Sequence, residues 1–235
     1  MTAQEIIEDA LSEIRVKRAG FSVSNEDIQL GLRVLNRMMS HWSGADGLMV
    51  PWRTREELSM SGGARSYTIG SGGTLNTTRP TAIHLARLKS GSTEYSLRQA
   101  SLEQIERWPD KTSPGRPDLF YYEPADPLGT IYFEQQTDQA YTLILWSIKP
   151  MTGFTAVTTE DSVPDEYPEM LVTNLAVRLA PHFAKEAAQT TKAMAASTMA
   201  KIKGHNLMSR VPTLVVDHAL RRGRFDFTSG DFADE

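Results

Sequence analysis

Apolar residues recur at helical spacing in the first part of the chain. Residues 2–18 predict an amphipathic helix, whose apolar stripe consists of Ile6, Ile7, Ala10, Leu11 and Ile14. Thr2 and Glu5 have the spacing of a capping box, which satisfies free amide groups at a helix start. Gly20 is a typical residue for ending such a helix.

A second helix is predicted from Ser24 to about Trp42. Two neighbouring apolar stripes run along it, and they consist of Ile28, Leu32, Leu35, Met39 and Trp42, and of Leu30, Val34 and Met38. Each apolar face must pack against another part of the protein or against another subunit. One interpretation is a core helix of a bundle, and the other adds a contact with a second subunit. Met38, Met39 and Trp42 are the expected packing residues in either case.

The period changes to about two between residues 49 and 158, which predicts β-strands. The predicted strands are 55–60, 65–70, 81–89, 93–98, 118–123, 129–135 and 140–149, with a short capped helix at 101–108. The sequences SGGA (61–64) and SGS (90–92) are typical of hairpin turns. The glycines of 69–74 lack the lysine and following helix of a phosphate-binding loop, so they also indicate a hairpin turn. The segment predicts an antiparallel small sandwich or barrel.

The helical pattern returns at about residue 165 and passes through Pro181 into an alanine-rich stretch that ends at Gly204. A proline within a helix costs ~3 kcal/mol, so the pattern predicts a bent rod with its kink at Pro181. Leu175, Leu179 and Phe183 are expected to pack in the bundle or against another subunit.

Residues 206–235 have a different composition. Arg221, Arg222 and Arg224 are followed by Phe225, Phe227 and Phe232 with acidic residues between them. A terminal segment of this kind cannot bury its aromatic residues within itself. It is either a disordered tail or an arm that docks on a partner through the phenylalanines.

The expected fold is therefore α+β, with a discontinuous α-helical bundle made by the N- and C-terminal parts. Residues 1–48 and 160–205 would form the helical domain. Residues 49–159 would form the inserted antiparallel β-domain, and residues 206–235 an extended C-terminal arm.

Composition narrows the possible functions. The chain has no cysteine, which excludes disulfides and thiolate nucleophiles. Its net charge of −4 argues against a protein that grips DNA through the phosphates. The sequence has neither an apolar run long enough for a membrane span nor a signal peptide. Basic residues occur in RTREE (53–57) and LARLK (85–89), but without the aromatic residues of a platform for single strands.

No motif specifies chemistry. The five histidines have no metal-ligand spacing, and no nucleophile elbow is present. We therefore expect no catalytic residue, metal or cofactor. A carboxylate pair that only the fold brings together stays open, so a tail-associated peptidoglycan hydrolase is an alternative.

Two segments resemble a known family. LNRMMSHWSGADGL (35–48) and NLAVRLAPHFAKEAAQTTKAMAASTMAKIKG (174–204) are similar in order and spacing to the head-to-tail adaptors of short-tailed bacteriophages. Members of this family are also called packaged-DNA stabilisation proteins or head-completion proteins. YTIGSGGTLNTTRP (67–80) resembles a segment of longer members that carry an inserted region.

The resemblance implies a structural virion protein, made in the host cytoplasm, that binds beneath the portal after DNA packaging. About twelve copies would form a closed ring that matches the portal symmetry. The ring would extend the DNA channel, help retain DNA until ejection and present a platform for tail proteins such as a nozzle, tail hub or fibres. Double-stranded DNA would pass through without sequence-specific binding. The arm residues Arg221 to Phe232 would bind the portal protein. Another connector, such as a tail terminator, is a further alternative.

Overall fold

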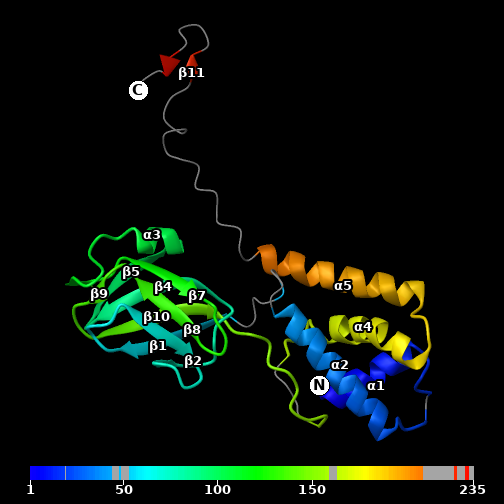
Figure 1. The fold of residues 1–235 in the computed structure, drawn as a ribbon. Coiled ribbons are helices and arrows are strands. Elements are labelled where there is room, and N and C mark those ends of the chain that lie inside the picture. The colour runs from blue at the N-terminus through cyan, green and yellow to red at the C-terminus, as the bar shows by residue number, and fades with distance from the viewer. Residues whose placement is uncertain are drawn as a thin grey trace.

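The protein has a mixed α+β fold. The computed structural model describes residues 1–18, 20–43, 48, 53–158 and 163–208, together with two short strands at 225–226 and 231–232. The helices of this part are α1 (Ala3–Glu13), α2 (Asn25–Trp42), α3 (Leu102–Glu106), α4 (Pro168–Leu179) and α5 (Gln189–Met208), with a 3-10 turn η2 (Ala180–Phe183). The strands are β1 (Arg53–Met60), β2 (Ser66–Gly70), β3 (Leu75–Asn76), β4 (Ala82–Ser90), β5 (Thr93–Gln99), β6 (Pro114–Gly115), β7 (Leu119–Glu123), β8 (Gly129–Phe133), β9 (Gln136–Thr137), β10 (Tyr141–Ile148), β11 (Phe225–Asp226) and β12 (Asp231–Phe232). Figure 1 shows α1, α2, α4 and α5 grouped together, whereas α3 lies on the β-sheet.

The capping box predicted for the first helix is confirmed. The Thr2 hydroxyl accepts a hydrogen bond from the Glu5 amide, and the Glu5 carboxylate accepts one from the Thr2 amide at 2.8 Å. The helix is shorter than expected, because α1 ends at Glu13 and Arg15 adopts a left-handed φ of 56°. The chain therefore leaves the helix well before Gly20, the residue that was expected to end it.

One hydrophobic core takes its side chains from both ends of the chain. The residues that are almost completely buried in it include Ile7 and Leu11 of α1, Leu35 and Met38 of α2, and Leu175 and Leu179 of α4. Burial of each such side chain stabilises the fold by about 1.5–3 kcal/mol. Because these helices are far apart in sequence, their contacts depend on the chain returning to its start after the β-sheet.

The segment that follows β10 also belongs to this helical core. Met151 and Phe154 are buried in it. The Asn36 side chain on α2 holds Phe154 by two bonds, since it donates to the Phe154 carbonyl at 2.9 Å and accepts from its amide at 2.8 Å. The Ser43 hydroxyl accepts from the Met151 amide at 2.9 Å. The end of the β-region is thus fixed along α2.

The predicted bent rod is wrong. Helix α4 ends at Leu179, Pro181 lies in the 3-10 turn that follows, and Ala184 has a left-handed φ of 52°. The chain then turns back, so that α5 lies along α4 (Figure 1). The amide of Asn174 on α4 donates to the Ala195 carbonyl of α5 at 3.2 Å. Pro181 therefore terminates a helix, because it lacks the N–H that would continue the ladder.

The strands form an eight-stranded sheet in the order β1-β10-β4-β5-β7-β8-β2-β3. Its edge strands β1 and β3 contact each other, so the sheet is nearly closed. The prediction of a purely antiparallel domain is wrong, because the pairs β5–β7, β2–β3 and β6–β9 are parallel. Between β5 and β7 the chain crosses over through α3, and such a crossover returns a strand in its original direction.

The three predicted hairpin turns have different outcomes. The turn after β4 is confirmed, since Ser90 pairs with Thr93 and Gly91 has a φ of 57°. The SGGA segment (61–64) does not form a hairpin, because β1 pairs with β10 and β2 pairs with β8 and β3. The glycine run of 69–74 is also no hairpin, since the strands on either side of it pair in parallel. A second hydrophobic core, separate from the helical one, lies inside the sheet. Its largest fully buried side chains include Tyr67, Phe120 and Phe133.

Candidate assembly surfaces

A partly buried ion pair lies where the two edges of the sheet meet. Lys149 Nζ lies 2.6 Å from the Glu56 carboxylate of β1. It also donates to the Thr77 hydroxyl at 3.0 Å and to the Thr78 carbonyl at 2.6 Å, just after β3. Two hydrogen bonds and one ion pair of the ammonium group therefore join β1 to the segment that follows β3. This arrangement is structural, because an ammonium group held in this way is not available as a nucleophile.

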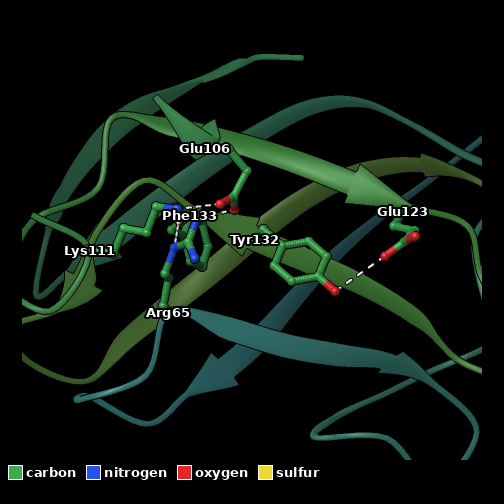
Figure 2. A network of polar contacts seen from close by, with 6 residues as sticks. All are labelled: Arg65, Glu106, Lys111, Glu123, Tyr132 and Phe133. Atoms are coloured by element: carbon green, nitrogen blue, oxygen red, sulfur yellow. Dashed lines mark hydrogen bonds and ion pairs between the residues drawn. The ribbon is translucent and has the colours of Figure 1, made fainter. Parts of the chain in front are cut away.

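A second polar cluster attaches α3 to the sheet (Figure 2). Arg65 donates to the Phe133 carbonyl at 3.0 Å and lies 2.7 Å from the Glu106 carboxylate. Lys111 also binds this carboxylate. Hydrogen bonds from Lys111 first, and from Arg65 second, lower the pKa of Glu106. A carboxylate with a lowered pKa stays ionised at neutral pH, which is unfavourable for a general acid.

The carboxylate of Glu134 also has a structural role. The Glu134 side chain is buried and accepts hydrogen bonds from the backbone amides of Asp118 at 2.6 Å and Leu119 at 2.9 Å. Both of its oxygens thus hold the chain as it enters β7. Among the residues that the structure describes, no group of three histidine or acidic side chains could hold a metal ion. None of the described helices is long and apolar enough to cross a bilayer.

The structure brings the predicted packing residues of the helices together. Buried in the helical core are Met38, Met39, Trp42, Leu175 and Leu179, and Phe183 is partly buried against it. The Arg178 guanidinium lies 5.9 Å from the centre of the Trp42 ring. In the single chain these residues therefore make contacts within the helical bundle.

Helix α5 extends into the segment that was predicted to be the arm. Asn206 lies in α5, is 5% exposed, and donates to the Tyr167 hydroxyl at 3.0 Å. The residues up to Met208 therefore belong to the helical unit. Of the predicted arm residues, Arg221, Arg222, Arg224 and Phe227 lie outside the described residues. Phe225 and Phe232 are register partners in the antiparallel pair β11–β12.

The sheet carries a surface groove that sequence reasoning missed. Six residues line it: Arg55, Leu85, Arg87, Glu94, Ile144 and Trp146. The basic residues come from the two segments RTREE and LARLK, and the aromatic residue comes from β10, which lies between them in the sheet. Neither sequence segment predicted the groove by itself, because residues of four strands, β1, β4, β5 and β10, build it.

A larger hollow of about 840 Å³ lies between the start of α4 and the end of α5. Its lining includes Asp165, Glu166 and Glu169 on one side and Lys201 and His205 on the other. This hollow adjoins the point at which the chain leaves α5. It contains charges of both signs and no defined set of ligands.

These features define the class of protein. The part of the chain that the structure describes consists of a helical core closed by both chain ends and a nearly closed sheet, and its polar clusters join elements together. The model of the family described as SU10 adaptor protein, a family of phage head-to-tail adaptors, matches residues 1–217. The chain belongs to this family, and the resemblance to phage head-to-tail adaptors is confirmed. It is accordingly a structural component of a phage virion. A comparison with curated proteins finds no match.

Proposed function

We propose that this protein forms a ring of about twelve copies that binds beneath the portal after DNA packaging. The ring extends the DNA channel, helps retain the packaged DNA and provides a platform for tail proteins. The observation that carries this proposal is the family match over residues 1–217, which includes the helices at both ends and the whole β-sheet.

The helical unit is the proposed ring-forming wedge. Residues 1–48 and 160–205 contribute most of its core, and α5 extends it to Met208. Because the segment after β10 packs with these helices, our proposed boundary of the inserted β-domain is near residue 149 instead of residue 159. A core closed by both chain ends supports a rigid subunit, which a closed ring requires.

The outer face of α5 is the proposed contact between subunits. One face of this helix packs on α4 through Ala195 and Ile202. The other face exposes Ala193, Ala196 and Ala200, and Met194 is 46% exposed. Small side chains allow another helix to approach closely. This face therefore favours a neighbouring protein surface over solvent.

The charge of the chain agrees with a channel for DNA. A net charge of −4 gives weak overall repulsion of phosphates, so DNA can slide without being gripped. The segment after Met208 is the proposed portal-binding arm, with the three phenylalanines Phe225, Phe227 and Phe232 as anchors.

Portal binding tests the ring and the arm separately. The full chain, a chain that ends at Met208, and a full chain with the three phenylalanines changed to alanine are each mixed with the cognate portal and imaged by electron microscopy. We expect rings on the portal with the full chain and weaker attachment with the other two. The end at Met208 keeps the bond between Asn206 and Tyr167, so the helical unit stays intact.

Three results would contradict the proposal. Equal portal binding by all three chains would show that the C-terminal arm does not bind the portal. Binding to the tail tube and never to the portal would identify a tail terminator. Lysis of cell-wall substrate in a zymogram, abolished by one acidic substitution, would identify a hydrolase.

A further inference from the structure

Two helices of the helical unit carry exposed charges of opposite sign at the same spacing. Helix α1 exposes an acidic stripe that consists of Glu5, Asp9 and Glu13. Helix α2 exposes Arg33 and Arg37, which are also four residues apart. Residues at this spacing lie on one side of a helix, about 6 Å from each other along its axis. The acidic stripe and the two arginines can therefore face each other charge by charge.

A third arginine continues the positive charge from α2 onto α4. The Arg178 guanidinium is half-buried and lies over the Trp42 ring, 5.9 Å from its centre. Burial first, and the positive charge of Arg37 second, lower the pKa of Arg178. These two guanidinium groups are therefore near enough to repel each other, and a carboxylate beside them would relieve the repulsion. Arg33, Arg37 and Arg178 together form an arginine patch.

Neither set of charges is neutralised within the single chain. No ion pair among the residues that the structure describes includes a member of the acidic stripe or of the arginine patch. Glu5 accepts a hydrogen bond from the Thr2 amide, and Glu13 accepts one from the Thr191 hydroxyl of α5 at 3.5 Å. Each carboxylate can accept further donors. Like charges four residues apart also repel each other along a helix, so both sets gain from an oppositely charged partner.

We propose that the acidic stripe of one copy pairs with the arginine patch of the next copy in the assembled protein. A second copy is the partner because it brings three carboxylates at the spacing of the arginines. Asp9 is the middle residue of the acidic stripe, and Arg37 is the arginine that neighbours both others. These two residues form the central pair in whichever direction the two helices run. A contact between unlike surfaces joins subunits head to tail, as in a closed ring.

The inference deepens the proposed ring, on which it rests, by naming the charges that align neighbouring subunits. The exposed alanines of α5 provide a close contact but carry no charge that could fix its alignment. The hydrogen bond from Thr191 to Glu13 places the acidic stripe beside the start of α5. The stripe and the outer face of α5 can therefore belong to one contact surface. Opposite charges at such a surface steer the encounter and disfavour wrong alignments.

Double-stranded DNA is a less favoured partner of the arginine patch. Guanidinium groups also bind phosphates. The net charge of the chain is −4, however, and the acidic stripe lies on the same helical unit, so the phosphates meet repulsion as well as attraction. A second copy neutralises both sets of charges, whereas DNA neutralises only the arginines.

Charge reversal in the full chain tests the pairing. Asp9→Arg and Arg37→Glu each place like charges at the central contact, so each variant should associate about tenfold or more weakly than the unaltered chain. An equal mixture of the two variants should regain association, because every contact between unlike chains then joins opposite charges. The matched control is Arg98→Glu, since Arg98 of β5 is exposed and lies outside the patch. Association is measured by sedimentation without portal and by electron microscopy on the cognate portal.

The proposal is overturned if Arg37→Glu associates as well as Arg98→Glu, if the mixture of variants stays dissociated, or if the unaltered chain associates in neither measurement. It is also overturned if a DNA duplex binds the unaltered chain and Arg37→Glu weakens only that binding, which would identify DNA as the partner. Rings of Arg37→Glu on the portal would refute this pairing and leave the proposed ring standing. Association in solution that only the mixture restores, without rings on any portal, would support the pairing and contradict the proposed function.

Discussion

Gly31 of α2 faces α1, and Gly204 of α5 faces open space. Comparing the same substitution at these two glycines therefore tests how closely α1 packs on α2. A Cβ added at Gly31 of α2 would collide with Cγ2 of Ile7 and lie 3.1 Å from its Cγ1. Ile7 is fully buried, and a β-branched side chain has little freedom to move aside. At Gly204 of α5 an added Cβ would have no neighbour within 4 Å. The same substitution therefore meets a packed site in one helix and open space in the other.

Alanine at either position gains about 1 kcal/mol of helix propensity over glycine. Overpacking at Gly31 costs about 1–3 kcal/mol, so we expect Gly31→Ala to be neutral or destabilising by up to about 2 kcal/mol. Gly204→Ala should stabilise the helical unit by about 0.5–1 kcal/mol, since it is close to the helix end. The two variants should therefore differ by about 1–3 kcal/mol.

The assay is urea unfolding followed by circular dichroism at 222 nm, which reports chiefly on the helices. The difference between the two variants removes the propensity gain that they share, and it leaves the packing cost at Ile7. If Gly31→Ala stabilises the protein as much as Gly204→Ala does, α1 and α2 do not pack closely at this point. The reasoning about the helical core would then be refuted.

Three further substitutions test the polar contacts. Tyr167→Phe removes a buried hydroxyl that donates to the Leu48 carbonyl at 2.9 Å, and we expect a loss of about 1–3 kcal/mol in urea unfolding. Lys149→Met leaves the Glu56 carboxylate unpaired at the closure of the sheet. It should cost about 2–4 kcal/mol, most of which a second change of Glu56 to glutamine should restore. Arg65→Met removes one hydrogen bond that holds down the pKa of Glu106, so carboxyl NMR titration should show that pKa moving up towards its ordinary value. An unchanged value would contradict the network in Figure 2.

Much of the local structure could be predicted from the sequence. Thr2, Ser24 and Ser101 cap their helices, and alternation of apolar and polar residues located the longer strands. Capping and periodicity depend on residues a few positions apart, so a single sequence carries that information. The candidate groove could not be found in this way, because Arg55, Trp146 and Leu85 meet only in the sheet register.

The alanine-rich segment shows the limit of local reasoning. Its composition is typical of a helix, and α5 is indeed a helix, but propensity could not show that the chain turns back at Ala184. The antiparallel arrangement is stabilised by contacts between α5 and α4, such as the bond from the Asn174 amide to the Ala195 carbonyl. These contacts exist only once both helices are in place.

The sequence by itself thus determined which segments become helices and strands and which family the chain resembles. The tertiary structure decided the strand partners, the end of α4 at Leu179, before Pro181, and the positions of the exposed surfaces. The physical reason is that helix capping and the helix and strand periods depend on residues a few positions apart. Burial in a core and strand pairing depend on contacts between residues far apart in the chain.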